Sequence, residues 1–118
     1  MKNKGYIIAT LAYSLAILAL SLKPVSPVAD EGILFEVFWN FMHAPVYAFL
    51  AFLILKSFTP SNVKIYVLAF FITVIYGILN ELVQSFVPGR SPSLMDVGLN
   101  TIGAASVLTF IYSSKISY

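Results

Sequence analysis

The sequence predicts an all-helical, polytopic membrane protein with four transmembrane helices in a compact bundle. The 118 residues are 59% hydrophobic and only 10% charged, which lies outside the usual range of soluble globular domains. A chain this short holds one domain, residues 1–118, and about four spans of the roughly 20 apolar residues that cross a bilayer core. Cysteine is absent, which excludes disulfides, thiolate nucleophiles and cysteine metal sites.

The first span is expected over residues 5–22. Two lysines precede this apolar run, as in a signal peptide, but Lys23-Pro24 follows it where a small-residue cleavage site would stand, so we interpret it as an uncleaved helix. Small side chains let helices approach closely in lipid. We therefore expect a packing face along the alanines that recur at three- and four-residue spacing, Ala9, Ala12, Ala16 and Ala19.

A connector over residues 23–39 begins with two prolines and then offers Asp30 as a helix N-cap. The segment after Asp30 is amphipathic, with Glu36 on the polar side and three aromatic residues on the other. It predicts either an interfacial helix or an extension of the second span.

The second span is expected over residues 40–57 and contains Pro45, which removes a backbone hydrogen bond and disfavours helix at Ala44. A kink beside His43 is therefore expected. If the helix continues through this point, one polar face carries Glu36, Asn40, His43 and Tyr47.

The third span is expected over residues 63–87, ended by Pro88-Gly89, and the fourth over residues 93–112, after Ser91-Pro92-Ser93 with a serine as N-cap. Both carry a polar stripe at offsets 0, 4 and 7, on the side where the third helix ends and the fourth begins. The stripes consist of Gly77, Glu81 and Gln84 in the third helix, and Asp96, Asn100 and Gly103 in the fourth.

The positive charges predict the orientation of the bundle. Alternating the loops between the two sides places five lysines on one side, against Lys23 and Arg90 on the other. Because cytoplasmic loops carry the excess of Lys and Arg, both termini are expected on the cytoplasmic side of a bacterial-type cytoplasmic membrane. At 1.5 Å per residue, Glu81 and Asn100 then lie at a similar depth, roughly 10 Å below the outer surface. Polar residues from three helices are thus expected to converge in the outer leaflet.

These residues resemble the pattern of the VanZ-like family of membrane proteins over residues 43–103. The match comprises His43 and Tyr47, followed by Tyr76-Gly77, Glu81, Gln84, Phe86, Pro88, Arg90, Asp96, Asn100 and Gly103. The family often has Asp-Lys before its histidine, where this chain has Trp39-Asn40. The resemblance implies a small helical membrane protein related to those linked with resistance to glycopeptide antibiotics, particularly teicoplanin, without an agreed reaction.

Three of these side chains support both a structural and a functional interpretation. Glu81 costs about 2.5–3.5 kcal/mol to insert, whereas an interhelical hydrogen bond in lipid returns only about 0.6 kcal/mol, which favours function. Asp96 has the capping-box spacing from Ser93, and it also lies where it would line a pocket. Arg90 is either an interfacial arginine on lipid phosphates or, beside a helix N-terminus, the holder of a phosphate or carboxylate.

The remaining polar residues complete the hypothesis. A histidine beside carboxylates exchanges protons near neutral pH, so we assign hypothetical proton exchange to His43, Glu81 and Asp96. We assign ligand binding to Arg90, Gln84, Asn100, Tyr47 and Tyr76, although both tyrosines suit packing equally well. His43, Glu81 and Asp96 also have ligand types suited to a divalent ion, but they lack diagnostic spacing, so neither a metal nor a cofactor is expected.

The predicted function is recognition of an anionic envelope lipid or lipid-linked precursor headgroup in an outward-facing polar pocket. The alternative is a membrane-embedded hydrolase or transferase acting on such headgroups. A transporter would need polar residues along the inner halves of the helices, which this sequence lacks. Nucleic acid is not an expected partner because there is no basic stripe, and the sequence leaves the oligomeric state open.

Overall fold

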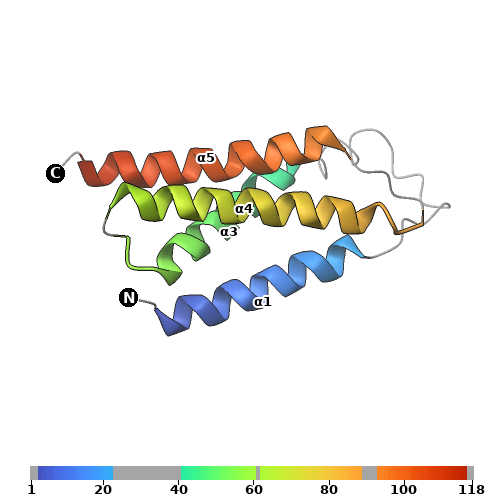
Figure 1. Cartoon of the computed structure of the whole chain (residues 1–118), viewed down its shortest axis with the longest axis horizontal. Helices are drawn as coiled ribbons and strands as arrows, with labels where there is room; N and C mark the ends of the chain where they lie inside the picture. The colour runs from blue at the N-terminus through green and yellow to red at the C-terminus, as the bar shows by residue number, and fades with distance from the viewer. Residues whose placement is uncertain (1–2, 23–40, 61, 89–92, 117–118) are drawn as a thin grey trace.

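The protein folds as a bundle of α-helices in a computed structural model that describes residues 3–22, 41–60, 62–88 and 93–116. The helices of this part of the chain are α1 (Lys4–Ser21), α3 (His43–Ser57), α4 (Val63–Gln84) and α5 (Leu94–Ile116) (Figure 1). The predicted all-helical, four-helix fold is thus confirmed. The connector over residues 23–39, with its possible interfacial helix, lies outside the described residues.

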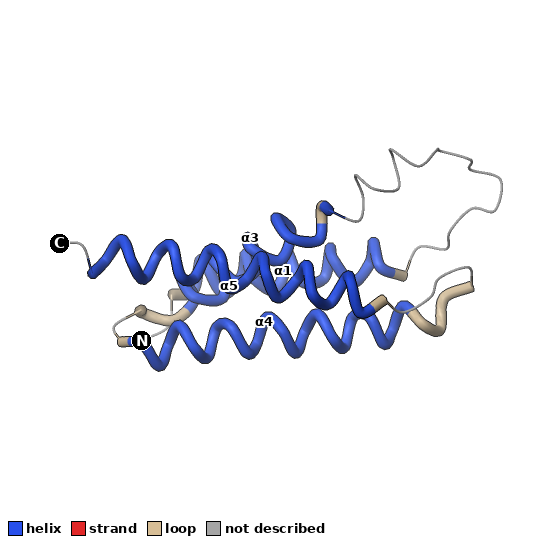
Figure 2. The backbone as a smooth tube through the Cα atoms, turned by 90° about the horizontal axis from the view of Figure 1, so that it is seen from above, coloured by secondary structure: helices blue, strands red, loops and turns tan. Residues whose placement is uncertain are grey.

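Consecutive helices run in alternating directions, so both termini lie at the same end of the bundle (Figures 1 and 2). Four lysines stand in the first or last turns of the helices at this end: Lys4, Lys56, Lys64 and Lys115. The opposite end carries the last turn of α4 and the first turns of α3 and α5. In the described part of the chain, the lysines therefore gather at the end that carries both termini.

Helix α3 is the centre of the fold, because it packs against α1, α4 and α5. It crosses behind α4 in Figure 1 and so connects the α5 side of the bundle with the α1 side. Leu50, Ala51 and Leu55 on this helix are completely buried. It approaches α5 closely at Gly103, where an added Cβ would lie 2.1 Å from the carbonyl oxygen of Ala44.

Three helices, α1, α4 and α5, are long and apolar enough to cross a membrane, whereas α3 is shorter. Its 15 residues span only about 22 Å at 1.5 Å per residue, compared with a hydrocarbon core of about 30 Å. The helix begins at His43, after Met42, whose backbone angles (φ −66°, ψ −16°) are still in the right-handed helical region. Pro45 falls in the first turn of α3, where its missing N–H costs little. Ala44 and Pro45 both lie within α3, and the kink beside His43 stays a prediction from the sequence.

The alanine stripe of α1 is not a packing face, which corrects the expectation from its spacing. Ala9, Ala12, Ala16 and Ala19 are all exposed on the outside of the bundle. Polar residues occupy the inner side instead: the Tyr13 hydroxyl donates to the carbonyl oxygen of Val46 at 2.8 Å, and the carbonyl oxygen of Ser14 accepts from the Tyr76 hydroxyl. Lipid solvates alanine as well as a protein interior does, but it offers hydroxyl groups no partner, so the hydroxyls turn inward.

Candidate functional site

The polar residues of the second half of the chain gather at the end of the bundle opposite the termini. Glu81, Gln84 and Asn100 are buried, with 5%, 7% and 2% of their surfaces exposed. His43 and Asp96 are half-buried there. The predicted stripes of α4 and α5 therefore face inward, and His43 joins them from the first residue of α3.

Two residues of α5 flank the imidazole of His43. Its Nδ1 lies 3.1 Å from Oδ1 of Asn100, and its Nε2 lies 3.8 Å from Oδ2 of Asp96. Because an amide oxygen only accepts, Nδ1 is assigned as the donor, and a second proton on Nε2 would face the carboxylate. Side-chain exposures of 25% for His43 and 17% for Asp96 leave this pair in reach of a ligand. A partly exposed imidazole that one neighbour orients, and that has a carboxylate near its other nitrogen, has the geometry of a proton-exchange site.

Glu81 caps the start of α5 from a neighbouring helix. Its Oε1 accepts the backbone N–H of Ser93 at 2.8 Å, and Oγ of Ser93 accepts the N–H of Asp96 at 3.3 Å. In an ordinary capping box the residue at the position of Asp96 would accept the Ser93 N–H. Here Glu81 takes that role, so the carboxylate of Asp96 faces His43 instead. The cap gives Glu81 a structural role, and proton exchange at this residue stays a prediction.

The two predicted tyrosines pack beside this site and hydrogen-bond away from it. The Tyr47 ring is stacked on the His43 imidazole, with centroids 6.5 Å apart and an interplanar angle of 9°. Its hydroxyl accepts a hydrogen bond from Nδ2 of Asn80 at 3.0 Å. The hydroxyl of Tyr76 bonds to α1, as described above. Tyr47 thus positions the imidazole, and Tyr76 ties α4 to α1.

Asn80 is a buried polar residue that the sequence reasoning missed, as it did Ser21, Ser57 and Thr73. It directly precedes Glu81 but faces α1 and α3, where its Nδ2 donates to Oγ of Ser21 at 2.7 Å and to Tyr47. It lies off the 0, 4, 7 stripe of α4. An amide within an apolar span was the available signal, because such a group requires a partner in lipid.

Two expectations remain outside this arrangement. Arg90 and Asn40 lie outside the described residues, so their predicted roles stay predictions from the sequence. Within residues 3–22, 41–60, 62–88 and 93–116, no three side chains of the His, Cys, Asp and Glu types are grouped to hold a metal ion.

Gly77 is expected to control the orientation of Asn100. An added Cβ at this position would lie 3.1 Å from Nδ2 of Asn100 and 3.3 Å from Cε1 of Tyr47, so both side chains would have to move. Gly77→Ala should cost about 1 kcal/mol of stability and change the environment of His43. The measurement is the imidazole nitrogen chemical shift of His43 in detergent-solubilised protein. Unchanged shifts in Gly77→Ala would contradict this contact.

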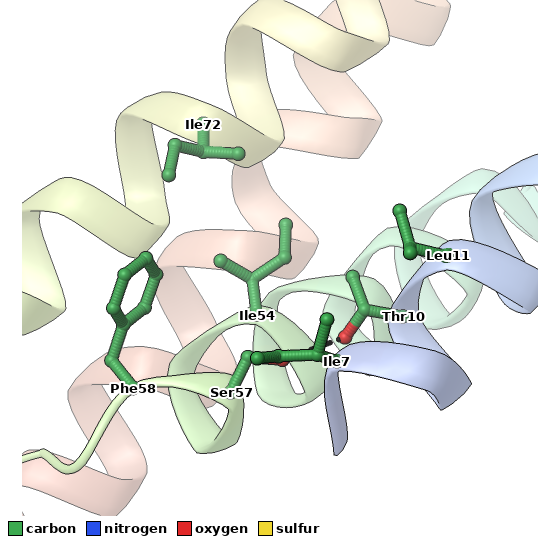
Figure 3. Close-up of a pocket in the computed structure, with 7 residues that line it drawn as sticks. All are labelled: Ile7, Thr10, Leu11, Ile54, Ser57, Phe58 and Ile72. Atoms are coloured by element: carbon green, nitrogen blue, oxygen red, sulfur yellow. Dashed lines mark hydrogen bonds between the residues drawn. The ribbon is translucent and has the colours of Figure 1, made fainter. Parts of the chain in front are cut away.

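A hollow lies at the other end of the bundle, between α1, α3 and α4 (Figure 3). Its volume is about 280 Å³, and its lining is apolar apart from the two hydroxyls of Thr10 and Ser57, which lie 2.9 Å apart. It contains no ionisable side chain among its lining residues, Ile7, Thr10, Leu11, Ile54, Ser57, Phe58 and Ile72. The polar site, rather than this hollow, is therefore the candidate functional site.

Comparison with known proteins identifies the family of the chain. The model of the VanZ/LLP1 family matches residues 6–115, which include all four described helices except their terminal residues. No curated protein and no solved structure matches the chain. The family match covers nearly the whole chain, whereas the sequence resemblance rested on about half of it.

Proposed function

The chain belongs to the VanZ/LLP1 family, and from the polar site of its bundle we propose that it binds the headgroup of an anionic envelope lipid or lipid-linked precursor. The observation that carries this proposal is the His43 imidazole, bracketed by Asp96 at 3.8 Å and Asn100 at 3.1 Å. These side chains come from two different helices, and those of His43 and Asp96 remain partly exposed. Such a group at the end of a membrane bundle meets headgroups rather than lipid tails.

The position of His43 at the first residue of α3 also supports the binding of an anion. A helix N-terminus favours an anion.

Two features of the charge distribution support an outward-facing site. The four described lysines lie at the end of the bundle that carries both termini, and lysine-rich ends of membrane proteins face the cytoplasm. Arg90 follows α4 in the sequence and is the cation we assign to the anionic group of the ligand. Through such binding the protein would alter susceptibility to glycopeptide antibiotics, as the family resemblance implies.

A hydrolase or transferase acting on the same headgroups is the alternative. The proximity of Nε2 of His43 to the Asp96 carboxylate favours it, because this pair is able to take and return a proton. Asp96→Asn separates the two proposals, since it retains the shape of the side chain and removes its basicity. If Asp96→Asn still binds the headgroup, and neither the wild type nor the variant converts the bound lipid, the result favours the headgroup-binding function. Turnover by wild-type protein that is lost in the variant favours the enzyme.

The experiment is mass spectrometry of lipids that co-purify with the full-length protein. Wild-type protein should retain an anionic lipid or lipid-linked species, and Arg90→Ala or His43→Ala should retain about tenfold less of it, equivalent to about 1.4 kcal/mol. Lys115→Ala is the matched control, because it removes a cation from the opposite end of the bundle. Equal amounts of the lipid in wild type, Arg90→Ala and His43→Ala would refute headgroup recognition at this site.

A further inference from the structure

The interior of the bundle contains a polar cluster that the headgroup site does not use. Asn80, on α4, is 6% exposed and connects to Ser21, the last residue of α1, and to Tyr47 of α3. The next residue, Glu81, serves the start of α5. Asn80 therefore marks the point where α1, α3 and α4 meet, about one helical turn inside the end of α4.

The hydrogen-bonding capacity of this cluster is incompletely used. Both Nδ2 hydrogens of Asn80 are donated, one to Ser21 Oγ and one to Tyr47 Oη. The Ser21 hydroxyl hydrogen is donated to the carbonyl oxygen of Ile17 at 2.8 Å. Oδ1 of Asn80 is buried without a partner in the described part of the chain, and no described group accepts the Tyr47 hydroxyl hydrogen. One acceptor and one donor are thus unused on adjoining side chains.

Exchanging the oxygen and nitrogen of the amide does not remove this deficit. In the exchanged orientation Oδ1 accepts from the Tyr47 hydroxyl, but Nδ2 then occupies the position without a partner. Either orientation leaves one end of a buried amide unpaired, which costs about 1–3 kcal/mol. The cost is larger inside a membrane, where lipid supplies no compensating bond. A leucine at this position would avoid it.

We propose that Asn80 and Tyr47 bind a small neutral hydroxyl group inside the bundle. A hydroxyl both donates and accepts, so it satisfies Oδ1 of Asn80 and the Tyr47 hydroxyl together. Its source is either an ordered water molecule or a hydroxyl of the bound headgroup. Tyr47 links the two sites, because its ring stacks on His43 while its hydroxyl reaches Asn80. The headgroup source rests on the proposed function, and the water source does not.

The test is nuclear magnetic resonance of full-length protein labelled with ¹⁵N-asparagine, first in dodecylphosphocholine micelles, a detergent without hydroxyl groups. The Asn80 side-chain amide should show a cross peak to water protons despite its burial. Asn62 is the reference for an accessible amide, because it is exposed and its Oδ1 caps α4 by accepting the Lys64 N–H at 2.9 Å. Asn80→Leu identifies the Asn80 signal by its loss.

Adding phosphatidylglycerol distinguishes the two sources. Replacement of the water cross peak by one to the glycerol headgroup assigns the hydroxyl to the lipid, whereas a persistent water cross peak assigns it to water. The latter result supports the interior site even if headgroup binding fails, so the two proposals fail separately. Tyr47→Phe should weaken the cross peak at least twofold while Asn80 stays in place. Absence of any cross peak from the wild-type Asn80 amide, in both media, overturns the proposal.

Discussion

Gly103→Ala should lower the free energy of unfolding by about 3 kcal/mol, at the upper end of what overpacking costs. The added Cβ would stand 2.1 Å from the carbonyl oxygen and 2.9 Å from the carbonyl carbon of Ala44. Both contacts are to backbone, so no side chain is able to rotate away, and α3 and α5 must separate. Thermal unfolding in detergent, followed by aromatic fluorescence, should show a Tm about 10 °C lower.

The separation should also disable the candidate site, because His43 directly precedes Ala44. We expect Gly103→Ala to lose the co-purified lipid together with stability. Gly98→Ala is the matched control: it lies on the same helix, and an added Cβ there has no atom within 4 Å. It should be neutral or stabilising by up to about 1 kcal/mol, because alanine favours helix over glycine. Equal stability of the Gly103 and Gly98 variants would show that α3 and α5 do not pack this closely.

Glu81→Ala should cost about 2 kcal/mol, because it leaves the N–H of Ser93 without its carboxylate acceptor. Glu81→Gln retains an oxygen at the same position and should cost less than about 1 kcal/mol. The measurement is the rate of backbone hydrogen exchange over the first turn of α5. We expect Glu81→Ala to accelerate exchange at Ser93 and Asp96 severalfold relative to Glu81→Gln.

The same pair of variants separates the structural role of Glu81 from a catalytic one. Glutamine preserves the cap but removes charge and basicity, so a lipid phenotype retained in Glu81→Gln and lost in Glu81→Ala assigns this residue to positioning. A phenotype lost in Glu81→Gln, with hydrogen exchange at Ser93 unchanged, would instead assign proton exchange to the carboxylate. The cap supplies this carboxylate with a hydrogen-bond donor inside the bundle.

Much of the fold was predictable because its signals are local. The apolar stretches, the break at Pro88-Gly89 and the serine before α5 predicted the helices, although α4 ends at Gln84 rather than Val87 and α5 continues to Ile116 rather than Tyr112. The spacing of Glu81 with Gln84, and of Asp96 with Asn100, predicted that each pair shares a face. Both faces turn into the bundle, since lipid does not accept such groups.

Other features depended on which helices pack against one another. The alanines of α1 have the spacing of a packing face, yet they point outward because the inner side is occupied by hydroxyl groups that need partners. Asn80 and Ser21 are 59 residues apart, so the sequence offered no reason to pair them. The hydrogen bonds of Tyr47 and Tyr76 to α4 and α1 likewise required the arrangement of all four helices.

By itself the sequence determined that this chain is a helical membrane protein, that it belongs to a recognisable family, and that polar residues gather towards one end of the bundle. These follow from hydrophobicity, helical period and residue spacing, which are properties of one segment at a time. Only the tertiary structure decided that Glu81, rather than Asp96, accepts the Ser93 N–H, and that Asp96 is thereby left to face His43. The spacing from Ser93 to Asp96 is that of a capping box whichever carboxylate accepts the Ser93 N–H. Glu81 comes from another helix, so the identity of the acceptor depends on distances between helices that no local pattern contains.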